Sequence, residues 1–259
     1  MRHGKKRILP LLGLGILLSI LLTPTKAGAP PLPEDIPAPV EIRTVPEPSA
    51  EPEPEPPPQA IIPAAQDPVD DTYFEDAVFL GDSRTEGLFI YGGPSSARYL
   101  FAVGATVESV FTKAVEREDG TKAPLLDTLA EIDCSKIYVM LGVNELGWPQ
   151  AEMYREQSRK LVDRLREDHP EAVVVLQSIL PVSAKQEAKK TYVNNSRIAE
   201  YNQILREVAD EKACVWLDVG AAVADEEGFL PADITSDGVH LNIKGCGIWN
   251  EYLQTHPVT

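Results

Sequence analysis

Short apolar runs alternate with helical patterns from Asp71 to the end of the chain. Five runs are rich in aliphatic and β-branched residues and predict strands; they cover residues 77–80, 99–103, 136–141, 172–177 and 214–219. Most are continuously apolar, which is typical of strands that are covered on both faces of a parallel sheet. We therefore expect a buried parallel sheet of five strands.

The segments between these runs have the periodicity of amphipathic helices. Residues 151–168 stop short of Pro170 and carry Val162 and Leu165 on one face. Residues 198–208 repeat apolar side chains at i, i+3 and i+4, and a last helix is expected at about 243–253. Alternating strands and helices of this length predict a doubly wound α/β sandwich.

The first 70 residues have a different composition. Residues 1–29 combine a basic start, an apolar stretch from Ile8 to Leu22 and an Ala-x-Ala exit at 27–29, as secretory signal peptides do. Because cleavage there would leave Pro30 first, an uncleaved membrane anchor within residues 8–25 remains an alternative. Both interpretations predict export to the cell surface or beyond.

Residues 30–70 predict an extended tether. Residues 28–70 contain 14 of the chain's 23 prolines and nine acids against one base, a composition that favours polyproline II and self-repulsion. We expect a spacer that carries a globular domain at 71–259, or else a leader that only adds solubility. The formal net charge of -16 argues against nucleic acid and anionic membrane surfaces as partners.

Cysteine and metal chemistry have little support in the sequence. The three cysteines, at positions 134, 214 and 246, include no C-x-x-C pair and are expected to be small buried side chains with at most one disulfide. We expect neither a metal nor a cofactor.

The loop after the first predicted strand reads Gly81-Asp82-Ser83. It lacks the glycine and lysine spacing of a phosphate-binding loop and the second glycine of a dinucleotide fingerprint. Two interpretations remain open: Ser83 is a nucleophile at a strand-to-helix turn, or it caps a helix in a capping box with Glu86.

Other loops supply the remaining parts of acyl-transfer chemistry. The second and third strands lead into Gly104 and Asn144, whose amides could bind an oxyanion beside a serine nucleophile. Of four histidines, only His240 lies in a loop before a final helix, and Asp237 precedes it by three residues. That spacing lets the carboxylate hold the imidazole as a base for a hydroxyl.

Together these blocks resemble the SGNH hydrolases, also called the GDSL esterase/lipase family, over nearly all of residues 75–255. The matching blocks are GDS at 81–83, Gly104, GVN at 142–144 and DGVH at 237–240. The resemblance implies a three-layer, flavodoxin-like α/β/α sandwich. It also implies Ser83, Asp237 and His240 as the catalytic triad, with the oxyanion held by the amides of Ser83 and Gly104 and by the Asn144 side chain.

Two positions depart from that family pattern. Glu145 stands where the family often has Asp, so the local role of this carboxylate is open. Arg84 follows the nucleophile where many members carry an apolar residue. We expect Arg84 to be partly solvated and paired with an acid such as Glu86, or else to steer an anionic or sugar-bearing substrate.

These features predict an exported serine ester hydrolase that removes acetyl or other short acyl groups from cell-wall or other polysaccharides. Transfer of the acyl group to a sugar hydroxyl is an alternative for the same triad, particularly if the chain is membrane-anchored. A wall-associated binding module without turnover is a second alternative. The expected partner is an acylated small molecule or polysaccharide, and the expected state is a monomer.

Overall fold

The computed structural model describes residues 58–117 and 119–258. The predicted leader, the membrane anchor and most of the tether lie outside these residues. None of the helices within the two described ranges is both long and apolar enough to span a bilayer.

A parallel sheet of five strands forms the centre of the domain, in the order β2-β1-β5-β6-β7. The strands are β1 (Ala77–Gly81), β2 (Arg98–Phe101), β5 (Lys136–Met140), β6 (Val173–Gln177) and β7 (Val215–Leu217). All five runs expected from the sequence are thus confirmed as strands, with ends that differ by up to two residues.

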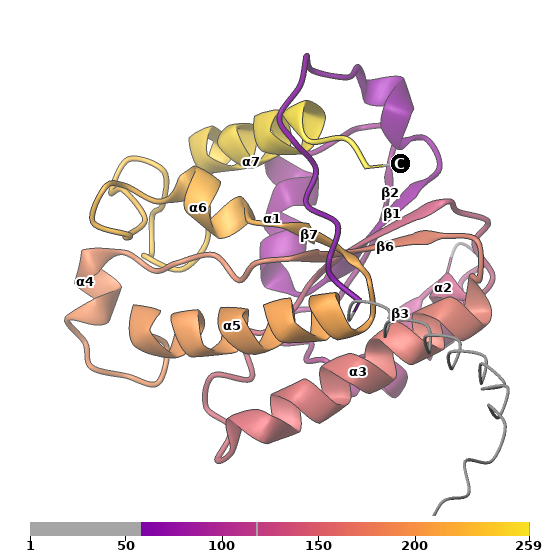
Figure 1. Ribbon diagram of the computed structural model, residues 1–259, viewed down its shortest axis with the longest axis horizontal. Coiled ribbons are helices and arrows are strands. Elements are labelled where there is room, and N and C mark those ends of the chain that lie inside the picture. Colours follow the sequence, from indigo (N-terminus) through magenta and orange to yellow (C-terminus); the bar gives the residue numbers. More distant parts are fainter. Residues whose placement is uncertain (1–57, 118, 259) are drawn as a thin grey trace, which may run out of the picture. The chain divides into compact units, whose positions relative to one another are not determined.

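Helices cover both faces of this sheet (Figure 1). One face packs against α2 (Leu125–Leu129), α3 (Ala151–Asp168) and α5 (Asn195–Glu211), and the other against α1 (Ser83–Tyr91), α6 (Val219–Val223) and α7 (Ile243–Thr255). Along β1, Val78 and Leu80 point to the first layer and Phe79 to the second. The predicted α/β/α sandwich is therefore confirmed.

Smaller elements occur along the chain besides the strands and helices of the three layers. The described residues also include α4 (Ala184–Glu187), the 3-10 helices η1 (Asp71–Phe74) and η2 (Ser109–Phe111), and an antiparallel pair, β3 (Ala114–Glu116) with β4 (Lys122–Pro124). This hairpin was not predicted from the sequence.

The chain contacts the domain before Asp71, where the domain was expected to begin. Ile61 runs parallel to β7: its amide donates to Cys214 O, and its carbonyl accepts from Trp216 N. Further along, the amide of Val69 donates to Gln254 O near the end of α7. Residues 60–70 thus lie across the β7 edge and towards α7.

Candidate active site

The turn between β1 and α1 places Ser83 at the first position of a helix. Asp82 is the N-cap, and its side chain accepts from the amide of Arg84 at 2.8 Å. Gly81 is needed because a Cβ there would overlap the Thr85 side chain and the Met140 carbonyl. The capping role that the sequence left open for Ser83 was therefore wrong: Asp82 performs it, which leaves the serine hydroxyl available for another partner.

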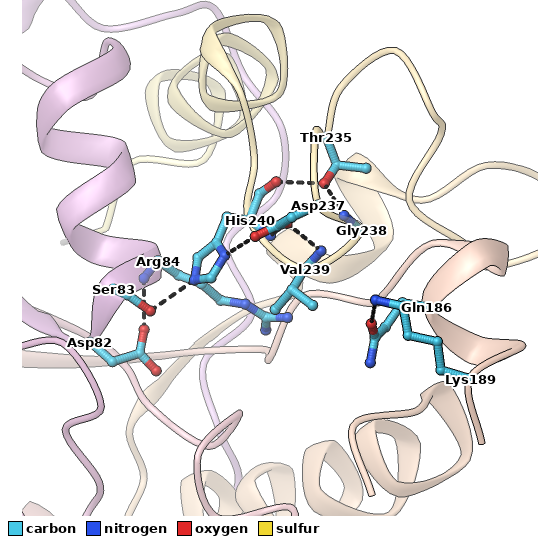
Figure 2. Close-up of polar contacts among 10 residues, drawn as sticks. All are labelled: Asp82, Ser83, Arg84, Gln186, Lys189, Thr235, Asp237, Gly238, Val239 and His240. Atoms are coloured by element: carbon cyan, nitrogen blue, oxygen red, sulfur yellow. Dashed lines mark hydrogen bonds and ion pairs between the residues drawn. The ribbon is translucent and has the colours of Figure 1, made fainter. Parts of the chain in front are cut away.

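That partner is His240, which lies 157 residues further along the chain (Figure 2). Ser83 Oγ is 2.9 Å from His240 Nε2, and His240 Nδ1 is 2.6 Å from Asp237 Oδ2. With Nδ1–H donating to the carboxylate, Nε2 is free to accept the serine proton. The structure thus brings the three predicted triad residues into one hydrogen-bonded line.

The Asp237 carboxylate is held by its own loop. Oδ1 accepts from the amides of Val239 and His240, both at 2.8 Å. Burial alone would raise the pKa of Asp237, but the hydrogen bonds from His240 and Val239 lower it to about 2. Asp237 therefore remains an anion over the whole neutral range, as a partner of an imidazole base must.

Two neighbours fix the shape of the 237–240 loop. Thr235 Oγ1 donates to His240 O at 2.6 Å and accepts from Gly238 N at 3.0 Å (Figure 2). Gly238 has φ of 87°, and a Cβ there would overlap Ser183 Oγ; the Ser183 amide also donates to Gly238 O at 2.9 Å. Glycine is therefore required at the centre of the loop.

The three candidate oxyanion donors follow neighbouring strands. Gly104 lies exposed beyond β2 with φ of 72°, Ser83 follows β1, and Asn144 follows β5. Asn144 Nδ2 donates to Ala105 O at 2.8 Å and to Asp82 Oδ2 at 3.1 Å. Asn144 thus contacts the neighbours of the other two donors, and its Nδ2 makes both of these hydrogen bonds within the protein.

Arg84 is buried beneath the site, and its expected pairing with Glu86 was wrong. The side chain is 3% exposed, and Nη1 donates to Leu180 O at 3.0 Å. Nε and Nη2 have no hydrogen-bond partner within the described part of the chain. Burial lowers the pKa of Arg84 to about 10, against the opposing influence of Asp82 and Asp237. The spacing of four residues to the buried Leu88 was the one sequence signal for this burial.

Glu145 is a second buried ionisable group that the sequence did not place. Its side chain is fully enclosed; Oε1 accepts from Val107 N at 2.7 Å, and Oε2 has no partner among the residues described. Burial, and secondarily the charge of Asp82, raises the pKa of Glu145 to about 8. Glu145 is therefore mostly protonated at neutral pH.

A cleft of about 860 Å³ opens at the serine and histidine. Its lining includes Ser83, Asp237 and His240, as well as Val103, directly before Gly104. All three cysteines are free, and within residues 58–117 and 119–258 no cluster of three or more His, Cys, Asp or Glu side chains could hold a metal ion. The groups available at this cleft thus include a hydroxyl, an imidazole and a carboxylate.

Comparison with known proteins agrees with this geometry. Residues 79–248 match the model of the GDSL-like Lipase/Acylhydrolase family. No match was found among the curated proteins.

Solved structures share the fold at low sequence identity. A GDSL-like lipase from Bacteroides thetaiotaomicron is 17% identical with a TM-score of 0.53, the match covering 69% of this chain and 86% of that one. A candidate acylhydrolase from Bacteroides fragilis is 18% identical with a TM-score of 0.53, covering 73% and 88%. A candidate platelet activating factor from Streptococcus pneumonia is 22% identical with a TM-score of 0.55, covering 71% and 88%. The chain belongs to the GDSL-like lipase/acylhydrolase family and is a carboxylic ester hydrolase of that type.

Proposed function

We propose that the protein is an exported serine hydrolase that removes acyl groups from a cell-wall or other polysaccharide through an acyl-enzyme on Ser83. The observation that carries the proposal is the line of hydrogen bonds from Ser83 Oγ to His240 Nε2 and from His240 Nδ1 to Asp237. In this arrangement the hydroxyl is activated by a base whose tautomer is already fixed.

The proposed reaction has two halves. Ser83 Oγ attacks the ester carbonyl while His240 Nε2 takes its proton, and Asp237 stabilises the resulting imidazolium. The amides of Ser83 and Gly104 and the Asn144 side chain stabilise the oxyanion. His240 then returns the proton to the leaving alcohol oxygen, which leaves an acyl-Ser83 ester. Water, activated by His240, hydrolyses this ester and restores the hydroxyl.

Hydrolysis is favoured over acyl transfer by the solvent access of the triad. The side chains of His240 and Asp237 are 41% and 51% exposed, so water can reach the acyl-enzyme. A transferase needs the opposite, a site from which water is excluded until an acceptor binds. The polysaccharide substrate is supported by the predicted secretory leader and the long acidic tether, which suit a soluble polymer outside the cytoplasm.

The chemistry is tested by comparing the full chain with Ser83→Ala and with Ser196→Ala, an exposed serine near the start of α5. We expect the wild type and Ser196→Ala to hydrolyse p-nitrophenyl acetate at equal rates and Ser83→Ala to lose turnover by at least about 10³-fold. Mass spectrometry of the quenched wild-type reaction should locate the acyl group on the peptide that contains Ser83. Equal rates for Ser83→Ala and Ser196→Ala would exclude this nucleophile.

The substrate half of the proposal has a separate test. Acylated and chemically deacylated samples of one cell-wall polysaccharide are incubated with the wild type, and the released acid is measured. Release from the acylated polymer alone supports the proposal. Turnover of p-nitrophenyl acetate without release from any acylated polysaccharide would refute the polysaccharide substrate and leave the triad assignment intact.

A further inference from the structure

One face of α1 forms the floor of a groove that begins at the nucleophile. Ser83, Gly87 and Ile90 are spaced by four and three residues, which places them on the same side of the helix. All three line the 860 Å³ cleft, and Tyr91 lies beside Ile90 in the same lining. Over seven residues the helix rises about 10 Å. The groove therefore extends along α1 for about two turns beyond the serine.

Several side chains that line this groove are apolar but exposed. Ile90 is 58% exposed, Val103 is 63% exposed and Ile243, the first residue of α7, is 68% exposed. Single exposed apolar residues are normal, but several gathered in one concave site mark a surface that binds an apolar group. Here the apolar surface shares one cleft with Ser83.

Gly87 keeps the floor of the groove open. A Cβ at this position would meet no atom within 4 Å, so packing does not require glycine here. Glycine inside a helix costs about 0.5–1 kcal/mol relative to alanine, so the local preference of the helix does not explain it either. What glycine does provide is free space in the middle of the groove, between Ser83 and Ile90.

We propose that this groove, formed by Gly87, Ile90, Tyr91, Val103 and Ile243, binds the hydrocarbon chain of an acyl group longer than acetyl. The inference rests on the proposed function, because it takes Ser83 as the nucleophile. In an acylated polysaccharide the alcohol side of the ester is a sugar, so a hydrocarbon chain belongs to the acyl side.

The charges of the lining are compatible with this assignment. The lining contains one lysine, Lys244, whose charge is paired with Asp233. Its two acidic residues are Glu86 and Asp237. The neutral ester meets no electrostatic penalty there, whereas the carboxylate product carries a charge of the same sign as both acids. The groove therefore binds the chain of the substrate and favours release of the acid.

The first test is the chain-length profile of the full-length protein. The values of kcat/KM are measured for p-nitrophenyl acetate, butyrate and octanoate at concentrations where each ester is monomeric. Burial of a methylene group is worth up to about fourfold, so we expect at least about a tenfold rise from acetate to octanoate, mainly through KM. A flat or falling profile overturns the proposal. A parallel series of alkyl acetates lengthens the alcohol side of the ester instead, and a preference for longer chains in that series alone also overturns the proposal.

The second test closes the groove. Gly87→Leu places a side chain on the open floor, and Gly247→Leu makes the same change at a position of α7 that is exposed, equally free of neighbours and outside the cleft. We expect Gly87→Leu to lower the octanoate-to-acetate ratio of kcat/KM by at least about tenfold, whereas Gly247→Leu keeps the wild-type ratio. Equal ratios for the two variants would overturn the proposal.

A binding measurement separates this inference from the proposed catalysis. Titration calorimetry measures the affinity of the Ser83→Ala protein for the octanoyl ester in the absence of turnover. Adding Gly87→Leu should weaken that affinity by at least about tenfold. Equal binding by the single and double variants refutes the groove, whatever the outcome with Ser83. Conversely, esterase activity that persists in Ser83→Ala refutes the proposed nucleophile even if the groove binds the ester.

Discussion

Glu145 should make the stability of this protein depend on pH in a way that one substitution removes. Its carboxyl is fully buried, and only Oε1 has a partner, the amide of Val107. Ionisation would place a negative charge in a site without solvent and near the charge of Asp82. Burial, and secondarily Asp82, therefore raise the pKa of Glu145 to about 8. Glu145→Gln keeps the size of the side chain and its acceptor oxygen but cannot ionise.

The sign of the effect follows from the protons bound in each state. A glutamate in the unfolded chain loses its proton near pH 4.3, whereas folded Glu145 keeps it until about pH 8. Between these values the folded protein holds one more proton, so the free energy of unfolding decreases as the pH rises and levels off above pH 8. At about 1.4 kcal/mol per pH unit, the decrease is on the order of 3–5 kcal/mol.

The assay is equilibrium unfolding in urea between pH 5 and pH 9 for the wild type, Glu145→Gln and Glu200→Gln. Glu200 is an exposed glutamate on α5, so the same substitution there removes a charge without altering the interior. We expect the stability of Glu145→Gln relative to the wild type to increase by that amount from pH 5 to pH 9. The reasoning is refuted if both variants differ from the wild type by a constant across the range.

Three further substitutions test the site. Asn144→Ala should lower kcat by about 10²-fold if its amide stabilises the oxyanion, and unchanged steady-state turnover would restrict Asn144 to its bonds with Asp82 and Ala105. Gly238→Ala should lower kcat by at least about tenfold, because the new methyl overlaps Ser183 Oγ and the loop needs a positive φ; Ser183→Gly in the same chain should restore part of it. Asp237→Asn should lower kcat by about 10⁴-fold with unchanged circular dichroism. Because the pKa of Asp237 is about 2, its protonation should cause no loss of activity above about pH 4.

The layered fold could be predicted because its signals are local. Apolar runs, most of them continuous, marked all five strands. The helix at 151–168 was predicted at both ends, and Pro170 closely follows its last residue. The hairpin of β3 and β4 was not predicted because each strand has only three residues and none of them is buried, so neither carries the apolar run of a buried strand. The pairing of Ile61 with Val215 of β7 depends on a tertiary contact, and the proline-rich composition around Ile61 gives no sign of it.

The meeting of Ser83, Asp237 and His240 could also be predicted, because loops at the carboxyl ends of parallel strands share one edge of the sheet. The burial of Glu145 could not, and that of Arg84 was signalled only by its spacing of four residues to Leu88. A charged residue in a loop or first helical turn is exposed by default, and only the packing around it decides otherwise. The apolar groove was missed for a related reason: Ile90, Val103 and Ile243 lie in three separate segments, and no one segment is unusually apolar.

The ionisation of these buried groups bears directly on the proposed chemistry. The side chain of Asn144, which would stabilise a negative oxygen, donates to Asp82, and the charge of Asp82 contributes to the raised pKa of Glu145. The charge of Arg84 interacts with those of Asp82 and Asp237, whereas burial is the main cause of the raised pKa of Glu145. A protonated Glu145 therefore limits the negative charge that opposes the oxyanion. Above about pH 8 the ionisation of Glu145 should reduce kcat in the wild type, whereas Glu145→Gln should retain its turnover. If kcat depends on pH in the same way in both proteins, the buried carboxyl has no influence on catalysis.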